Sequence, residues 1–260
     1  MRLSALVYYA RSIPKILFGF QPLPQVVGLF LGRSAAHPLG IKLRASGLQY
    51  RVRTAMDVWI IKETILDRLY EDGMPLQDSW VVIDIGAGLG DFTTYAAWRS
   101  PHGRVLAFEP DADSFALLEH NLRLNSIDNV QVRPWAVSDV PGTLHLNIDS
   151  EHATDHSTTT VGAHTIEVPA ITLAQILDDQ QLPHCDLLKI DAEGAEYSIL
   201  MGTGPETLKR IRRIALEYHD NTPAGTHDVL ADFLRKHDFQ VRVCVNPVHD
   251  YLGYLYAIRN

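Results

Sequence analysis

Residues 81–93 read VVIDIGAGLGDFT, and this stretch decides the fold. Four of its first five residues are aliphatic, as in a strand that is buried on both faces of a parallel sheet. Three alternating glycines then predict a tight turn, after which a helix is expected to begin with Asp91 or Thr93 as its cap. Because glycine has no Cβ, such a turn lets the backbone approach a ligand closely. The stretch therefore predicts a fold that binds a nucleoside-type cofactor.

Two acidic residues near this turn indicate which cofactor it is. Glu109 ends the next expected strand, where folds of this kind place the carboxylate that binds the ribose hydroxyls. Asp84 lies just before the glycines, where a carboxylate would repel a pyrophosphate but would suit a cation. S-adenosylmethionine carries an ammonium and a sulfonium group and no phosphate. The sequence therefore favours S-adenosylmethionine over a dinucleotide, and the G-x-G-x-G spacing also departs from the dinucleotide pattern.

Strands and helices alternate along the rest of the chain, which predicts an α/β fold with a Rossmann-like, doubly wound, mostly parallel seven-stranded sheet. The expected strands are 80–85, 104–109, 130–137, 186–191, 211–218, 239–245 and 252–258, and the expected helices are near 91–99, 113–125, 172–177 and 229–236. A short connection joins the last two strands, so the final strand must be reversed. Residues 142–148 predict an added antiparallel strand, and 149–165 a loop that covers the acceptor.

Charge divides the chain into two parts. Residues 1–56 contain eight Lys or Arg and no Asp or Glu, whereas the remainder carries 15 basic and 31 acidic residues. We expect a mainly helical N-terminal extension at 1–79 and a catalytic domain at 80–260. Two interpretations stay open for residues 1–33. They form either a cap on the catalytic domain or on a second subunit, or an interfacial anchor with basic side chains near anionic headgroups.

Composition also narrows the location and the partners. Two cysteines, Cys185 and Cys244, are too few for a disulfide framework and suit a reducing compartment. We therefore expect a cytoplasmic protein, with a peripheral position at the inner membrane face and a homo-oligomer as further options. The acidic body argues against a nucleic-acid partner, because such partners require clustered basic charge.

Several motifs recur together in one known family. They are the glycine turn, FEPD at 108–111, NLRLN at 121–125, AVSD at 136–139 and LKIDAEGAE at 188–196. On these motifs the chain resembles the FkbM family of S-adenosylmethionine-dependent methyltransferases over roughly residues 80–220. Members typically methylate hydroxyl groups on sugars, glycolipids or polyketide-type natural products. Residues 1–79 lie outside the resemblance, and Ala174-Gln175 stands where relatives often carry Asp-Glu.

The resemblance implies which residues hold the cofactor. Asp84 and the glycines would surround its methionyl part, Glu109 would bind the ribose, and Ser138 and Asp139 would lie beside the adenine. The full set of expected cofactor-binding residues is Asp84, Gly86, Gly88, Gly90, Phe92, Glu109, Pro110, Ser138, Asp139 and Asp191.

Methyl transfer requires an aligned nucleophile and, for an alcohol, a group that removes its proton. The expected catalytic residues are Asp191 and Glu193 after the fourth parallel strand, and Glu217 and His219 at the end of the fifth. His219 is the preferred general base, because an unperturbed histidine has a pKa of about 6.5. The four side chains could also gather around Mg²⁺ or Ca²⁺, but their spacing gives a divalent metal little support. For Glu196 we expect helix capping.

The sequence thus predicts an O-methyltransferase that acts on a hydroxyl of a sugar, glycolipid or related natural product. Residues 191–194 read DAEG. They lack the Pro-Pro-aromatic pattern common in enzymes that methylate exocyclic amines. Two alternatives remain open at this point, a nicotinamide-dependent oxidoreductase and a non-catalytic binding module of a glycan-assembly complex.

Overall fold

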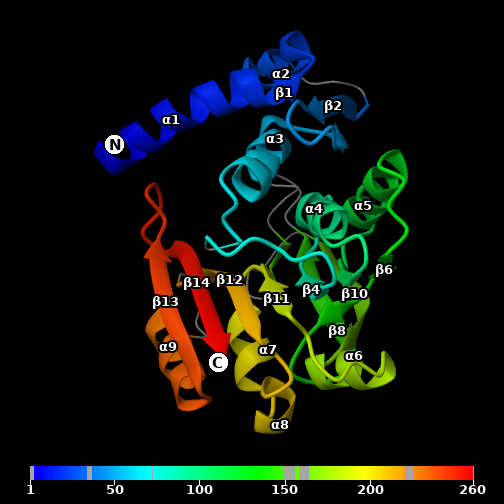
Figure 1. Ribbon diagram of the computed structural model, residues 1–260, viewed down its shortest axis with the longest axis vertical. Coiled ribbons are helices and arrows are strands. Elements are labelled where there is room, and N and C mark those ends of the chain that lie inside the picture. The colour runs from blue at the N-terminus through cyan, green and yellow to red at the C-terminus, as the bar shows by residue number, and fades with distance from the viewer. Residues whose placement is uncertain are drawn as a thin grey trace.

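The computed structural model describes residues 3–33, 37–71, 73–148, 156–157, 164–220 and 225–259. At its centre lies a seven-stranded sheet in the order β13-β14-β12-β11-β4-β5-β6. These strands are β4 (Val81–Ile85), β5 (Arg104–Phe108), β6 (Val130–Arg133), β11 (Leu187–Ile190), β12 (Arg213–His219), β13 (Phe239–Val245) and β14 (Leu252–Arg259). Within this sheet β14 runs in the direction opposite to that of the other six strands. The predicted Rossmann-like sheet with a reversed final strand is confirmed (Figure 1).

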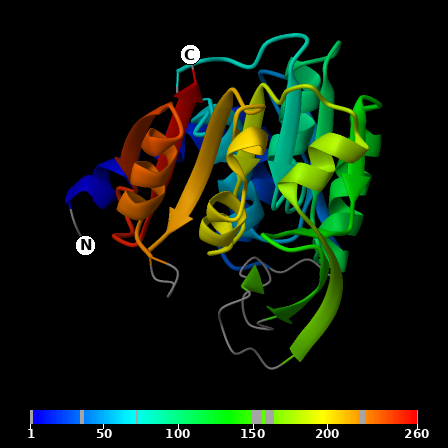
Figure 2. The same cartoon turned by 90° about the horizontal axis from the view of Figure 1, so that it is seen from below.

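Helices cover both faces of the sheet (Figures 1 and 2). One face packs against α6 (Leu173–Asp179), α7 (Glu196–Met201), α8 (Pro205–Leu208) and α9 (His227–Lys236), and the other against α3 (Ala55–Ile61) and α4 (Asp91–Arg99), with α5 (Ala112–Leu124) beside them. Side chains alternate along a strand, so Ile83 enters the first core and Val82 the second. Burial on both faces explains why the strand sequences are apolar almost throughout.

The N-terminal extension packs into the second of these cores. Its elements are α1 (Leu3–Gly19), β1 (Phe20–Gln21), α2 (Leu23–Phe30), β2 (Leu39–Leu43), β3 (Gln49–Val52), α3 and the π-helix η1 (Lys62–Leu66). Phe20, Tyr50 and Val58 are fully buried and share this core with Tyr254 of β14. The small sheet β1-β2-β3 was not expected from the sequence. No helix of the described residues is long and apolar enough to cross a membrane.

A third, four-stranded sheet lies beside the central one. It comprises β7 (Ala136–Val137), β8 (Gly142–Ile148), β9 (His156–Ser157) and β10 (His164–Ile171), in the order β7-β10-β8-β9. The strand expected at 130–137 is divided into β6 and β7, because Pro134 cannot donate a hydrogen bond to a ladder. The antiparallel strand expected at 142–148 is confirmed as β8. The loop expected at 149–165 contains β9 and the start of β10, and its other residues lie outside the described ones.

Candidate active site

A cavity opens at the carboxyl ends of β4, β5 and β11, where ligands bind in sheets of this type. The central sheet and its connections contribute Gly86, Gly88, Leu89, Glu109, Pro110, Ser138, Asp139, Lys189, Asp191 and Glu193 to the cavity wall. The extension adds Arg53, Asp57, Ile60 and Tyr70. The cavity therefore combines residues expected from the sequence with side chains from a segment to which the sequence assigned no role at the site.

The glycine turn after β4 lies directly against β11. A Cβ built on Gly86 would be 1.7 Å from the carbonyl oxygen of Asp191, so only glycine fits there, and its φ of +72° is also one that glycine adopts readily. Gly90, with a φ of +84°, stands at the start of α4, where the sequence led us to expect Asp91 or Thr93 as the cap. The close approach at Gly86 fixes the donor turn beside the strand that carries Asp191.

Lys189 neutralises the acids beneath this turn. It is directly opposite Asp84 in the β4–β11 register, and its Nζ lies 3.1 Å from Asp84 Oδ1. It also donates a hydrogen bond of 2.6 Å to the Gly86 carbonyl oxygen. Burial lowers the pKa of Lys189, but Asp84 and Asp191 outweigh it, so the pKa is raised and the lysine stays charged.

This pairing corrects the expectation that Asp84 faces a cationic cofactor. The Asp84 side chain is fully buried, and its other oxygen, Oδ2, accepts a hydrogen bond of 2.5 Å from Thr93. It does not line the cavity. Lys189 was not predicted as a site residue, although its motif was recognised. Its position on a strand expected next to the one that carries Asp84 could have indicated the pairing.

Glu109 is held in the orientation expected of a ribose ligand. Its Oε2 accepts a hydrogen bond of 2.7 Å from the Gly88 N–H, and its Oε1 one of 2.9 Å from the Asp111 N–H. Burial raises the pKa of Glu109 to about 7, against the opposing effect of these two backbone donors. The carboxylate is thus fixed in the cavity wall next to the glycine turn.

Asp191 presents its carboxylate to the cavity from the end of β11. Tyr70 of the extension donates a hydrogen bond of 2.9 Å to Asp191 Oδ2, and Lys189 Nζ lies 4.0 Å from the same oxygen. Asp191 Oδ1 has no hydrogen-bond partner among the described residues. The side chain is 27% exposed. Asp191 is therefore oriented on one side and open to a ligand on the other.

His219 is clamped between two carboxylates behind this wall. Its Nε2 lies 3.2 Å from Glu193 Oε2, and its Nδ1 lies 3.3 Å from Glu196 Oε1. Burial lowers the pKa of His219, but the hydrogen bonds to Glu193 and Glu196 outweigh it and raise that pKa to about 12. An imidazole that is already protonated cannot accept a proton, and His219 does not line the cavity. The structure therefore contradicts the expectation that His219 is the general base.

The two acids that hold His219 differ in position. Glu196 is fully buried, and its carboxylate accepts hydrogen bonds from the N–H groups of Ala192 and Gly194, which is the capping interaction expected of it. Glu193 instead lines the cavity and is 31% exposed. Its φ of +48° is uncommon for a residue with a side chain, and such backbone strain is typical of functional sites.

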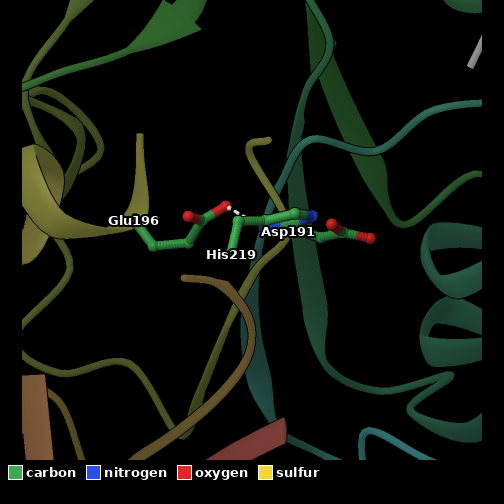
Figure 3. A group of neighbouring side chains, drawn as sticks. All are labelled: Asp191, Glu196 and His219. Carbon is green, nitrogen blue, oxygen red and sulfur yellow. Dashed lines mark ion pairs between the residues drawn. The ribbon is translucent and has the colours of Figure 1, made fainter. Parts of the chain in front are cut away.

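Asp191, Glu196 and His219 form a cluster that resembles a metal site (Figure 3). One ligand atom of each lies within 4.8 Å of the others. The ion pairs of His219 with Glu193 and Glu196 account for the composition of this cluster.

The remaining predicted residues divide into two groups. Pro110, Ser138 and Asp139 line the cavity. Phe92 and Glu217 do not, and neither does Gly90. Phe92 is buried and packs edge-on against Tyr70, with 5.3 Å between ring centroids, so it supports a residue of the wall. Glu217 is half-buried on β12, where burial and then the nearby Asp191 raise its pKa.

Arg53 of the extension is the second cation of the cavity, beside Lys189. Its Nε lies 3.5 Å from Asp57 Oδ2, an oxygen that also accepts hydrogen bonds from two backbone N–H groups. The two Nη atoms of Arg53 have no partner among the described residues. Because Lys189 forms an ion pair with Asp84, Arg53 is the cation of this cavity that can bind an anionic group.

These charges fit S-adenosylmethionine, which carries a carboxylate, an ammonium and a sulfonium group. Arg53 matches the carboxylate, the acid Asp139 matches the ammonium, and Glu109 matches the ribose hydroxyls. Gly86 and Gly88 leave room for a close approach of the backbone. The donor set of the cavity is therefore that of a methyl-donor site.

Comparison with known proteins agrees with this geometry. Residues 84–241 match the methyltransferase FkbM domain. The chain is 31% identical over 227 residues to the AMB antimetabolite synthetase AmbE of Pseudomonas aeruginosa, a match that covers 71% of this chain but 11% of AmbE. It is 27% identical over 222 residues to the 31-O-demethyl-FK506 methyltransferase FkbM of Streptomyces tacrolimicus, covering 73% of this chain and 84% of that protein.

A solved structure shares the fold. The methyltransferase FkbM from Methylobacillus flagellatus superposes with a TM-score of 0.51 at 18% identity, and the match covers 72% of this chain and 46% of that one. This likeness concerns the arrangement of strands and helices alone.

Proposed function

Because this chain belongs to the FkbM family of methyltransferases, we propose that it transfers a methyl group from S-adenosylmethionine to a hydroxyl oxygen of a sugar, glycolipid or related natural product. Membership of this family removes the nicotinamide-dependent oxidoreductase from the alternatives. A relative at 27% identity carries an oxygen acceptor in its name, 31-O-demethyl-FK506, which supports oxygen as the atom that is methylated.

One observation carries the proposal. Asp191 has a cavity-facing carboxylate with one oxygen that lacks a partner among the described residues, and its own carbonyl lies against Gly86 of the donor turn. A carboxylate placed beside the donor turn suits the removal of a proton from an alcohol, whose own nucleophilicity is weak. We therefore infer that Asp191 is the general base.

The residues of the cavity have different roles in the proposed reaction. When bound, S-adenosylmethionine supplies a methyl group that is already activated by its sulfonium. Asp191 Oδ1 would accept the proton that the acceptor hydroxyl loses when its oxygen takes this methyl group. Tyr70 and Lys189 hold Asp191 Oδ2, so the carboxylate keeps its direction. Glu193, held by the charged His219, is placed to orient the acceptor.

Two further features support a cytoplasmic location and an acceptor that is not a nucleic acid. Cys185 and Cys244 are both free thiols, which supports a reducing, cytoplasmic location. From residue 57 on, acidic residues exceed basic ones two to one, which supports a small-molecule or glycan acceptor rather than a nucleic acid.

The test uses S-adenosylmethionine labelled with ¹³C in its methyl group. The protein is incubated with a panel of methyl glycosides, glycolipids and a demethylated macrolide, and the chemical shift of the product's methyl carbon tells oxygen from nitrogen and carbon acceptors. Asp191→Asn should lower the rate by about 100-fold or more. Its matched control, Asp179→Asn, alters an exposed acid at the end of α6 and should leave the rate unchanged.

Calorimetric titration of S-adenosylhomocysteine distinguishes a loss of cofactor binding from a loss of catalysis. Binding that persists in Asp191→Asn while the rate collapses is the expected result. A full rate in Asp191→Asn would overturn the assignment of the base, and a methyl group found on nitrogen or carbon would overturn the proposed acceptor. If the wild-type protein binds neither S-adenosylmethionine nor S-adenosylhomocysteine, the chain is a non-catalytic module.

A further inference from the structure

Helix α1 leaves much of its apolar surface exposed to solvent. The residues that it buries are Ala5, Ser12 and Ile16. The outward residues at helical spacing include Leu3, Val7 and Phe18, which are 77%, 42% and 76% exposed. Leu6 and Ile13 are exposed as well. A surface helix normally buries its apolar stripe, whereas α1 has a second set of apolar side chains that no part of the described protein covers.

This orientation is fixed by polar contacts along the inner side of the helix. Ser4 Oγ donates a hydrogen bond of 2.9 Å to the Pro247 carbonyl oxygen, in the connection between β13 and β14. Tyr8 donates to Glu63 of η1 and accepts a hydrogen bond of 2.9 Å from the buried Lys62. Lys15 Nζ pairs with Asp67 at 2.6 Å. These contacts hold α1 along its length, so the apolar side cannot turn inward without breaking them.

Elements next to α1 also expose apolar side chains. Phe30 and Leu31, at the end of α2, are 42% and 73% exposed. The β13–β14 connection that Ser4 contacts exposes Val245 and Tyr251. Figure 1 shows α1 stretched across one end of the molecule, from α2 to this connection. An apolar surface of this extent marks an interaction site.

The charges of the extension indicate what covers this surface. Residues 1–56 contain no acidic side chain, and Arg11 of α1 and Arg33 after α2 are both exposed. The acids nearest to α1, Glu63 and Asp67, are on its inner side and are bonded to Tyr8, Lys15 and Lys62. A second copy of the chain would bring two basic extensions together, whereas an anionic bilayer complements both the apolar stripe and the positive charge.

We propose that α1 lies in the surface of an anionic membrane, with Leu3, Val7 and Phe18 between the lipids and Arg11 and Arg33 at the headgroups. A helix of 17 residues is about 25 Å long, too short to span a bilayer and suited to lie along one. The sheet edge that carries the active-site cavity is on the same end of the molecule as the β13–β14 connection, since His219 pairs with Leu252 there. The cavity is thereby held near the membrane surface.

The test is co-sedimentation of the full chain with vesicles of phosphatidylglycerol and phosphatidylcholine in equal parts, with pure phosphatidylcholine vesicles for comparison. Deleting residues 1–33 would remove buried core residues such as Phe20 and Val26, so point variants are used. Val7→Ser with Phe18→Ser should weaken binding about ten-fold or more. Arg11→Ser with Arg33→Ser should weaken it about five-fold per charge removed. Met201→Ser, at the exposed end of α7, is the matched control and should bind as wild type does.

Titration with S-adenosylhomocysteine in each variant shows that the fold is intact, and the vesicle result stands whether or not the proposed methyl transfer is correct. Wild-type binding that is equal for the two vesicle types would overturn the proposal, as would binding that neither pair of substitutions weakens. A wild-type dimer that becomes a monomer in Val7→Ser with Phe18→Ser, without any vesicle binding, would assign the surface to a second copy instead.

Discussion

Replacing Lys189 by methionine should destabilise the protein by about 3–5 kcal/mol. The Nζ of Lys189 lies 3.1 Å from Asp84 Oδ1 and 2.6 Å from the Gly86 carbonyl oxygen, and both side chains are buried. Methionine fills much of the volume of the lysine stem, so packing changes little. What is lost is the counter-charge of a carboxylate that water does not reach, and an uncompensated buried charge is the costly outcome.

The measurement is thermal unfolding followed by circular dichroism. For a chain of 260 residues the loss corresponds to a fall in Tm of about 6–20 °C. Lys42→Met, at an exposed position on β2, should stay within about 0.5 kcal/mol of wild type. Adding Asp84→Asn to Lys189→Met should restore part of the stability, because the unpaired charge is then gone. A Lys189→Met protein within about 1 kcal/mol of wild type would refute this account of the buried pair.

Three further predictions concern the cavity and the clamp behind it. Because burial raises the pKa of Glu109 to about 7, its carboxylate fraction grows between about pH 6 and pH 8. Calorimetry should show that S-adenosylhomocysteine binds more tightly as the pH rises through this window, and that Glu109→Gln loses the dependence; a flat wild-type profile would contradict it. Arg53→Met should weaken S-adenosylhomocysteine about ten-fold but leave 5′-methylthioadenosine, which lacks the carboxylate, unchanged. Equal losses for both ligands would disprove a carboxylate contact. The raised pKa of His219 adds stability that is complete below the unfolded value of about 6.5 and declines as the pH rises toward the folded one. The Tm difference between wild type and His219→Gln should therefore shrink from about pH 6 to pH 9, and a difference that grows would show the sign to be wrong.

The sequence predicted the central sheet well, because burial on both faces leaves a strong apolar pattern in each parallel strand. The glycine turn and the Glu109 position followed from the same pattern and the spacing. The strands of the extension were missed because β1 has only two residues and β2 and β3 four or five. Segments so short carry no clear alternation, and their pairing depends on contacts with distant parts of the chain.

At the site, the sequence identified the residue types but not their partners. Asp84 was assigned to a cofactor cation, whereas its counter-charge is Lys189 on the neighbouring strand. His219 was chosen for its ordinary pKa, but two carboxylates brought in by tertiary structure keep it charged. Arg53 and Tyr70 could not be foreseen, since the extension lies outside the recognised motifs and only folding brings it to the cavity.

The core that joins the extension to β14 has a consequence for how the chain is made. Phe20 and Val58 share a core with Tyr254 and Tyr256, which lie far downstream of them in the sequence. Tyr256 also donates a hydrogen bond of 2.5 Å to the Leu69 carbonyl oxygen. The extension therefore cannot complete its native packing until β14 has been synthesised. During that interval the apolar side chains that the extension later buries, such as Phe20 and Val58, stay exposed.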